Sequence, residues 1–134
     1  VSHCRWAEAD ELLPRADAVV ISAEDLAGQE LLAAQYAAQT RLLVLTRGAE
    51  GCTVYEGDQT RRFPAPTVRE VDPTGSGDIF AAAFFVWLQG SGDPWAAARF
   101  ANCVAARSVT REGLSGAPSP EEIGLCKRAL KKVR

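Results

Sequence analysis

The residues best suited to chemistry lie at positions 71–85, where a short apolar run ends and a longer one begins. Gly75, Ser76 and Gly77 leave main-chain N–H groups uncovered by bulky side chains. At the start of a helix such groups form an anion site, because they stand at the positive end of the helix dipole. Asp78 follows in the first turn of the same helix. Phosphoryl transfer to an alcohol requires both parts, since amides stabilise charge on the transferred oxygens and a carboxylate takes the hydroxyl proton.

The same four-residue sequence, GSGD, recurs at residues 90–93 in a different context. This copy follows a helix rather than a strand. Gly90 suits a helix C-cap, and Asp93 and Pro94 suit the N-cap and first position of the next helix. We interpret this copy as a tight link between two helices. GSGD alone is therefore weak support for an anion site, and the surrounding elements decide.

The part of the chain before these segments begins with a strand–helix–strand unit. Residues 18–21 and 42–45 are short, continuous apolar runs, as in strands that are buried on both faces. Between them, Ser22 and Asp25 form a capping-box-like start for a helix that runs to about residue 39. Strand, helix and strand within about 30 residues favour parallel pairing with a right-handed crossover.

The remainder of the chain predicts a hairpin, one more strand and three helices. Residues 52–55 and 60–63 flank a polar turn and predict a β-hairpin, and residues 68–71 predict a further short strand. The first expected helix, residues 77–89, is apolar nearly all round and should therefore be central. The second begins after Asp93 as N-cap and runs to about Ser108. The third begins after Ser119 as N-cap, with Glu122 closing a capping box. The chain is therefore predicted to be α/β, with a mostly parallel sheet covered by helices.

Composition limits the classes of protein to consider. With 134 residues, 47% of them hydrophobic and 24% charged, the chain is one domain's worth of soluble globular protein. A net charge of −2 argues against nucleic acid as a partner. The longest apolar run, residues 79–88, is about half of what a membrane span needs, and the N-terminus does not resemble a signal peptide. His3 is the only histidine and lies at the terminus, which argues against a Ser-His-Asp catalytic system and against a metal site with histidine ligands.

The four cysteines, Cys4, Cys52, Cys103 and Cys126, lie far apart and form no CxxC pair. This spacing favours free buried thiols over a disulfide framework or a metal site. We therefore expect reduced cysteines and a cytoplasmic location.

The string VDPTGSGDIFAAAF at residues 71–84 closely resembles the second signature of the ribokinase-like (PfkB) carbohydrate kinase family, whose usual form is D-[TP]-[TV]-G-[AS]-G-D before a helix rich in small residues. The resemblance covers nearly the whole chain. It implies a Rossmann-like three-layer α/β sandwich, in which residues 1–134 are a single domain and form the ATP-binding, catalytic C-terminal portion of a longer kinase. It also implies that Asp78 is the catalytic base and that residues 75–77 line the anion hole.

Two further stretches resemble parts of the family that contact ATP. Thr46, Arg47, Gly48 and Gly51 match a T-x-G-x-x-G turn beside the nucleotide, at the C-terminal end of a buried strand, where α/β folds place ligands. Asn102 matches a nucleotide-contacting position on a helix. Without the resemblance, the glycines could equally lead into a hairpin, and Asn102 could be a polar residue on a helix edge.

The resemblance also bears on cations. In several family members a loop holds a monovalent cation such as K⁺ through main-chain carbonyls, and the matching residues here are Asp72, Thr74, Ser108, Arg111 and Gly113. Main-chain ligands constrain side-chain identity little, so the sequence carries little information about this site.

The expected magnesium residues depart from the family pattern. The family commonly has Asn-x-x-Glu after the first strand, where it helps to organise Mg²⁺ and phosphate, and this chain has Ser22-Ala23-Glu24-Asp25. Ser22 and Asp25 either replace the family's Asn and Glu or only cap the helix.

The preferred hypothesis is a kinase that uses ATP and Mg²⁺ to phosphorylate a hydroxyl of a sugar, polyol or nucleoside. The rival is a non-catalytic nucleotide-binding or scaffold fragment that lacks the acceptor site. The family's sugar-binding residues, first glycine-rich signature and lid come mainly from the N-terminal half, so we expect the isolated chain to be inactive. Family dimers usually associate through the lid, so a homodimer is expected only for the full-length protein.

Overall fold

The computed structural model describes residues 7–132, so the predictions about His3 and Cys4 lie outside the described residues. The chain divides into two compact units. The first consists of Val1–Arg47 and Cys52–Arg62, and the second of Gly48–Gly51 and Phe63–Arg134.

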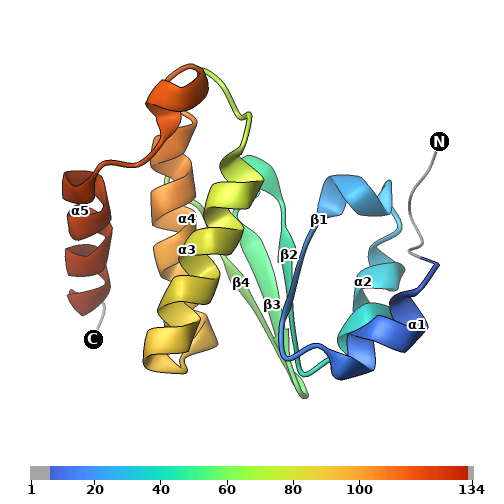
Figure 1. The fold of residues 1–134 in the computed structure, drawn as a ribbon. Coiled ribbons are helices and arrows are strands. Elements are labelled where there is room, and N and C mark those ends of the chain that lie inside the picture. Colours follow the sequence, from blue (N-terminus) through green and yellow to red (C-terminus); the bar gives the residue numbers. More distant parts are fainter. Residues whose placement is uncertain (1–6, 133–134) are drawn as a thin grey trace. The chain divides into compact units, whose positions relative to one another are not determined.

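A four-stranded sheet with the order β1-β2-β3-β4 forms the centre of the first unit (Figure 1). β1 (Val19–Ser22) and β2 (Leu42–Thr46) pair in parallel, as the strand–helix–strand pattern predicts. β3 (Cys52–Glu56) runs antiparallel to β2 and forms the predicted hairpin with β4 (Gln59–Phe63). The α/β prediction is confirmed. The sheet is mixed rather than mostly parallel, because the hairpin adds its first strand directly beside β2 without a crossover.

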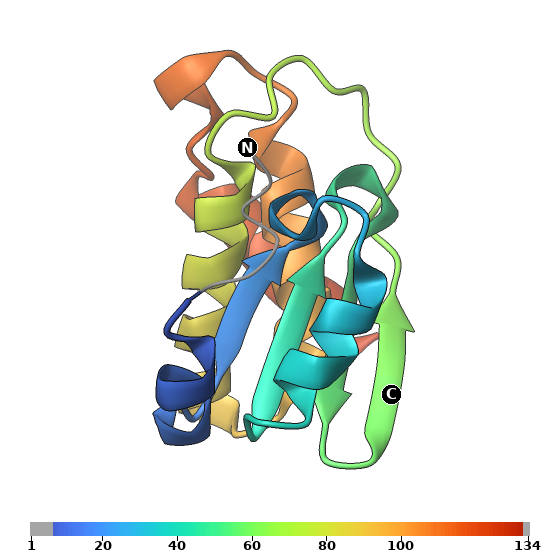
Figure 2. The same ribbon diagram turned by 90° about the vertical axis from the view of Figure 1, so that its right-hand side faces the viewer.

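The two α-helices of the first unit cover one face of this sheet (Figure 2). They are α1 (Ala9–Leu12) and α2 (Glu30–Ala37). Their buried side chains pack on alternate residues of β2, which share one face of a strand. The resulting core comprises Ala9, Leu13, Leu26, Leu32, Ala33, Tyr36, Leu43 and Leu45.

The single helix expected from Ser22 to about residue 39 is wrong, because the chain breaks it into two pieces. A 3₁₀ turn, Ala23–Leu26, follows β1 and ends at Ala27, whose φ of 48° is left-handed. Gly28 is also left-handed, with a φ of 82°, and α2 begins only at Glu30. Two successive left-handed residues cannot continue a right-handed helix, so the chain changes direction here.

Three long helices form most of the second unit (Figure 1). They are α3 (Ser76–Ser91), α4 (Pro94–Ser108) and α5 (Pro120–Lys131). The predicted N-caps are confirmed. Asp93 Oδ1 accepts hydrogen bonds from the amides of Trp95 at 2.9 Å and Ala96 at 3.1 Å. Ser119 and Glu122 form the predicted capping box of α5.

The link between α3 and α4 is tight, as predicted, but its capping glycine is different. Gly90 remains inside α3, which continues to Ser91. Gly92, with a φ of 69°, is the left-handed C-cap, and its amide donates to the carbonyl of Leu88 at 2.7 Å. The second GSGD copy is therefore a helix–helix junction.

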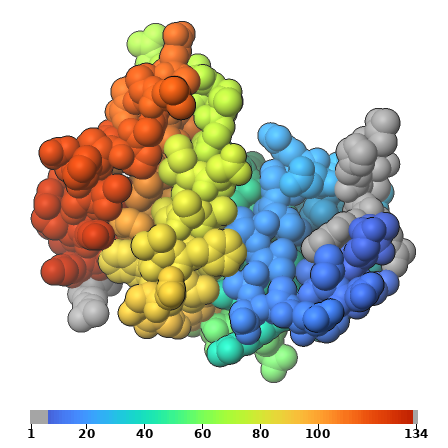
Figure 3. Space-filling model, in the orientation of Figure 1, coloured from blue at the N-terminus to red at the C-terminus, as the bar shows by residue number. Residues whose placement is uncertain are grey.

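The expectation that α3 is buried on all sides is wrong for the described chain. Phe80 and Phe84 are buried, whereas Phe85 is 41% and Val86 71% exposed. Figure 3 shows the yellow atoms of α3 on the surface that faces the viewer.

Residues 68–71 do not form the predicted strand. The amides of Val71 and Asp72 donate to the carbonyl of Val109 at 2.7 and 3.0 Å, which ties the segment before α3 to the end of α4. Pro64 and Pro66 lie just upstream and lack the N–H groups that a ladder needs, so the pairing does not extend.

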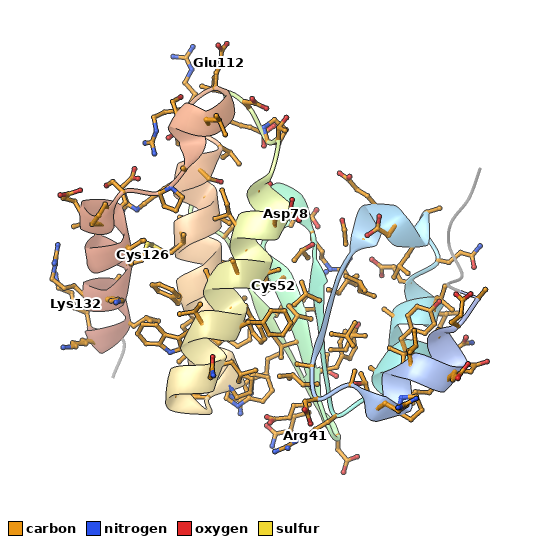
Figure 4. All side chains as sticks on the ribbon, in the orientation of Figure 1. Arg41, Cys52, Asp78, Glu112, Cys126 and Lys132 are labelled. Atoms are coloured by element: carbon orange, nitrogen blue, oxygen red, sulfur yellow. A yellow bond between two sulfur atoms is a disulfide. The ribbon has the colours of Figure 1, made fainter. Side chains whose placement is uncertain are left out.

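Cys103 and Cys126 form a disulfide between α4 and α5, with their Cα atoms 5.7 Å apart (Figure 4). The prediction of thiols at these two positions is therefore wrong. The packing of α4 against α5 determines whether the bond can form. Two cysteines that are 23 residues apart in sequence must have their Cβ atoms close together and facing each other. Cys52, in contrast, retains a buried thiol.

Among residues 7–132, no helix combines the length and the hydropathy that a membrane span requires.

Candidate active site

The N-terminus of α3 presents main-chain amides to solvent. Gly75 is the N-cap and has a left-handed φ of 79°, which favours glycine at this position. The first helical hydrogen bond runs from the Ile79 amide to the Gly75 carbonyl at 3.0 Å, so the amides of Gly77 and Asp78 precede it. The Ser76 amide is engaged differently, because it donates to the carbonyl of Pro73 at 3.1 Å. The amides best placed to hold an anion are therefore those of Gly77 and Asp78.

The Asp78 side chain stands in the first turn of α3 (Figure 4). It is exposed, and within residues 7–132 no hydrogen bond or ion pair occupies its carboxylate. An exposed carboxylate beside two amides without helical acceptors can accept a proton from a hydroxyl whose oxygen approaches a bound anion. The structure thus keeps together the two groups that the sequence singled out.

Asp72 connects the approach to α3 with the loop after α4. Its Oδ1 accepts from the Thr74 amide at 2.9 Å, and its Oδ2 accepts from the Gly113 amide at 3.0 Å. These bonds, that of Gly113 foremost, lower the pKa of the Asp72 carboxyl from 3.8 to about 2. Three of the five residues expected near a monovalent cation are therefore in contact, and both carboxylate oxygens accept main-chain N–H groups.

The carbonyls of Ser108 and Arg111 converge on Gly116. A Cβ at Gly116 would lie 2.4 Å from the Ser108 oxygen and 3.4 Å from the Arg111 oxygen, so only glycine fits. The close approach of these backbone segments therefore explains why residue 116 is a glycine.

The Arg111 side chain has a structural role. Its Nη1 and Nη2 donate to the two carboxylate oxygens of Glu122 at 2.8 and 3.0 Å, and its Nε donates to the carbonyl of Ser115. The guanidinium, followed by the Ser119 amide, lowers the pKa of Glu122 from 4.5 to about 2, and Glu122 in turn raises the pKa of Arg111. This pair joins the loop after α4 to the start of α5.

Gly51 and Asn102 both meet the carbonyl of Phe63. Gly51 has a φ of 98°, and a Cβ there would lie 2.0 Å from the Phe63 oxygen. Asn102 is only 4% exposed, and its Nδ2 donates to the same oxygen at 2.9 Å. These two residues therefore fix the path of the chain as it leaves β4. Gly48, with a φ of 56°, has open space around it.

The sequence reasoning did not identify Phe63 as part of this region. Its ring stacks on that of Trp95, with centroids 6.0 Å apart, and the Arg99 guanidinium lies 5.1 Å from its centroid. Trp95, Arg99 and Asn102 are spaced by four and three residues on α4, which places them on one helix face. That spacing is the signal that could have identified the cluster.

Thr46 and Arg47 belong to the first unit and are engaged there. Thr46 Oγ1 donates to the carbonyl of Ile21 at 3.3 Å. Arg47 pairs with Glu30 and lowers the pKa of that carboxyl, and its Nε donates to Thr53 Oγ1 at 3.3 Å. The first unit thus holds both residues at the end of β2.

Ser22 and Asp25 form a capping box. The Ser22 amide donates to Asp25 Oδ2, and the Glu24 amide donates to Ser22 Oγ, each at 3.3 Å. Of the two interpretations left open by the sequence, these contacts favour capping. In the part of the chain that the structure describes, no three His, Cys, Asp or Glu residues are grouped so that they could hold a metal ion.

Comparison with known proteins identifies similar chains. The model of the pfkB family carbohydrate kinases matches residues 2–122. Ribokinase of Bacillus subtilis (strain 168) is 40% identical over 82 residues, which are 60% of this chain and 28% of that protein.

Solved structures show the same fold. Ribokinase of Thermotoga maritima has a TM-score of 0.79 and 26% identity, over 89% of this chain and 44% of that one. The Escherichia coli protein described as ribokinase II, solved with ATP and Mg²⁺, has a TM-score of 0.76 and 26% identity, over 90% of this chain and 42% of its own. The ribokinase-like α/β prediction is confirmed, and the chain spans less than half the length of each of these three proteins.

Proposed function

Since the chain belongs to the pfkB family of carbohydrate kinases, we propose that it is the ATP-binding, catalytic part of a kinase that phosphorylates a hydroxyl of a sugar, polyol or nucleoside. The observation that carries this proposal is the N-terminus of α3, where the amides of Gly77 and Asp78 precede the first helical hydrogen bond and the Asp78 carboxylate is exposed beside them. The second GSGD copy, at residues 90–93, forms a helix–helix junction in which Asp93 caps α4, so we assign it no part in catalysis.

In this proposal the Asp78 carboxylate accepts the proton of the attacking hydroxyl, which increases the nucleophilicity of its oxygen. The main-chain amides of Gly77 and Asp78 stabilise charge on the phosphoryl oxygens, aided by the dipole of the 16-residue α3. ATP supplies the phosphoryl group, and Mg²⁺ bound with it offsets the charge of its phosphates. Because Mg²⁺ bound to a nucleotide needs only one or two carboxylates, a dedicated cluster of acidic residues is not required.

The other predicted residues receive supporting roles. The nucleotide lies along the turn of Thr46, Arg47, Gly48 and Gly51, with Asn102 fixing the nearby chain through the Phe63 carbonyl. The proposal that this chain binds ATP and Mg²⁺ is supported by the Escherichia coli relative, which was solved with both. K⁺ binding by the main chain near Asp72, Thr74, Ser108, Arg111 and Gly113 is a further part of the proposal, supported by the hydrogen bonds of Asp72 that bring Thr74 and Gly113 together.

The proposal assigns residues 1–134 to the C-terminal part of a longer, cytoplasmic enzyme that forms a homodimer through a lid outside this chain. The chain spans 28% of the Bacillus subtilis ribokinase and 44% of the Thermotoga maritima one, and the proposal assigns the residues that select the acceptor to the part of the enzyme outside this chain. This chemistry suits a small hydroxylated substrate, and the proposal includes no nucleic-acid partner.

Substitution of Asp78 in the full-length kinase tests the proposal. Asp78→Asn removes the proton acceptor and keeps the shape, so turnover should fall by about 10² to 10⁴ while ATP affinity stays nearly unchanged. Steady-state phosphorylation of a panel of sugars, polyols and nucleosides, with ATP titrations in parallel, measures both quantities.

The second GSGD copy provides a matched control. Asp93→Asn should leave turnover unchanged, since asparagine caps a helix about as well as aspartate does. Near-normal turnover in Asp78→Asn would show that the base is another group. ATP binding without turnover toward any acceptor in the unsubstituted full-length protein would instead support a nucleotide-binding scaffold.

A further inference from the structure

α5 is held on the second unit mainly at one position. It is a 12-residue helix, and Cys126 is its only buried residue. Ile123 and Leu130 are partly buried in the same cluster, and Leu125 is 45% exposed. A helix of this length is only marginally stable in water without tertiary contacts. The packing of α5 on α4 therefore depends largely on the contacts around residue 126, where the Cys103–Cys126 disulfide joins the two helices (Figure 4).

The two ends of α5 are attached differently. At the N-terminal end, Glu122 forms the capping box with Ser119 and accepts two hydrogen bonds from the Arg111 guanidinium. These contacts do not involve the disulfide. The C-terminal half instead carries four exposed cations, Lys127, Arg128, Lys131 and Lys132. Their like-charge pairs four residues apart offset part of their favourable interaction with the helix dipole. Without the disulfide, the C-terminal half is therefore the part of α5 that would separate from α4.

The two sulfurs of the bond differ in accessibility. Cys126 is 1% exposed, whereas Cys103 is only partly buried. The thiolate of an external dithiol can therefore attack Cys103 Sγ, and the electron pair of the S–S bond passes to Cys126 Sγ, which takes up a proton. The second thiol of the dithiol then attacks the mixed disulfide, and Cys103 leaves as a thiolate that is protonated. The dithiol is thereby oxidised to a disulfide, and the reverse exchange restores the Cys103–Cys126 bond.

The chain segment closed by this bond includes residues 109–119, which hold Asp72. The carbonyl of Val109 accepts from the Asp72 amide at 3.0 Å, and the Gly113 amide donates to Asp72 Oδ2 at 3.0 Å. Asp72 lies three residues before Gly75, the N-cap of α3. With the C-terminal half of α5 released, residues 109–119 would be attached to α5 only through its first turn. Opening of the segment, and with it of the Asp72 contacts, would then become more frequent.

We propose that Cys103 and Cys126 form a reversible thiol–disulfide switch, whose redox partner is a dithiol carrier. The oxidised form holds α5 on α4 and keeps residues 109–119 ordered. Reduction releases the C-terminal half of α5 and loosens the contacts of Asp72. In the cytoplasmic location of the proposed function, most thiols are kept reduced, and the disulfides that form there are usually transient or redox-sensing. The release of α5 is independent of the proposed function, whereas its effect on turnover rests on it.

Hydrogen exchange of the full-length kinase tests the switch, with the folded protein compared before and after reduction by excess dithiothreitol. Amides of residues 123–132 should exchange more than about tenfold faster in the reduced protein, because the cross-link no longer opposes local opening. Peptides from residues 109–117 should also exchange faster, by a smaller factor, and peptides from residues 79–88 should not change. Reoxidation should restore the slow exchange.

Two variants provide controls. Cys103→Ser cannot form the bond, so its exchange should match that of the reduced unsubstituted kinase and should not respond to dithiothreitol. Cys52→Ala removes a buried thiol that is not part of the bond, so this variant should keep the full response. If Cys103→Ser does not fold, reduction of the unsubstituted kinase still provides both states.

The inference fails in any of three cases. Equal exchange of residues 123–132 in both states would show that α5 stays on α4 without the bond. Resistance of the bond to dithiothreitol in the folded kinase would identify a purely structural cross-link. Faster exchange throughout, including residues 79–88, would show that reduction unfolds the whole protein.

Turnover is measured in the same samples and should fall on reduction and recover on reoxidation. Release of α5 with unchanged turnover would refute the coupling to Asp72. Hydrogen exchange does not depend on activity, so failure of the Asp78 proposal and failure of the switch remain distinguishable.

Discussion

Gly48 and Gly51 lie three residues apart in the connection between β2 and β3, and both have a positive φ. Their surroundings differ. A methyl group on Gly48 would meet nothing within 4 Å, whereas one on Gly51 would lie 2.0 Å from the Phe63 carbonyl and 2.6 Å from the Ala65 amide. The same motif thus contains one glycine required by its backbone angle and one required also by close approach of another segment.

This difference predicts unequal costs for two alanine substitutions. Gly48→Ala should destabilise the chain by about 1 to 2 kcal/mol, the cost of a left-handed alanine. Gly51→Ala should cost more than about 4 kcal/mol, because rigid backbone at residues 63–65 must move. Urea unfolding of both variants measures the difference. Equal effects would show that the close approach to Phe63 is absent.

Glu122 couples a helix cap to a charge pair and provides a pH prediction. Its pKa in the folded chain is about 2, against an ordinary value of 4.5. The carboxylate is therefore favoured in the folded state. Its stabilisation is fully present above about pH 4.5 and is lost as the pH falls toward 2.

Glu122→Gln should retain the capping box, since glutamine serves at this position, but lose the charge interaction with Arg111. The free energy of unfolding should then fall less steeply between pH 4.5 and pH 2 than in the unsubstituted chain, with Asp72 responsible for part of the remaining slope. Glu121→Gln, at the neighbouring exposed position, is the control. A slope that does not change in Glu122→Gln would refute the prediction.

At the scale of elements, the helices of the second unit are joined in two ways. Packing of α4 on α5 includes Phe100, Val104 and Cys126. The Cys103–Cys126 disulfide then connects the same two helices covalently. A cross-link stabilises mainly by restricting the unfolded chain, and its effect grows slowly with the length of the closed loop.

Removal of this bond should lower stability without abolishing the fold. For a separation of 23 residues the expected loss is about 3 kcal/mol, either in Cys126→Ser or after reduction. Unfolding curves with and without reductant measure it. Reductant should have no further effect on Cys126→Ser, and an unchanged midpoint in the unsubstituted chain would show that the two sulfurs are not joined in solution.

At the scale of the whole molecule, the proposed function gives this chain one part of a reaction site. It assigns to the chain the base and the helix N-terminus, and the chain spans 28% of the Bacillus subtilis ribokinase and 44% of the Thermotoga maritima one.

The isolated 134-residue chain should accordingly bind ATP weakly and show negligible phosphorylation of any sugar. Calorimetric titration with ATP and Mg²⁺ and a coupled kinase assay measure these properties, with the full-length protein as the active reference. Robust turnover by the isolated chain would show that the acceptor site has been placed in the wrong part of the enzyme.

The features predictable from the sequence are those set by neighbouring residues. The starts of α4 and α5 follow from Asp93 and from Ser119 with Glu122, because each cap is satisfied within three residues along the chain. The hairpin and the parallel β1–β2 pair follow equally from local patterning. The amides and carboxylate of the GSGD segment before α3 are also consecutive, but the second copy at residues 90–93 has the same four residues, and only the wider string VDPTGSGDIFAAAF distinguished the first copy.

The tertiary fold decided what depends on segments distant in sequence. Asn102 meets the Phe63 carbonyl across 39 residues, Asp72 meets the Gly113 amide across 41, and Cys103 meets Cys126 across 23. Sequence patterns record hydrophobic periodicity and local caps, whereas such contacts depend on how whole elements pack. Local hydrogen bonds therefore made the starts of α4 and α5 predictable from the sequence, and only packing determined which distant polar groups are engaged with one another.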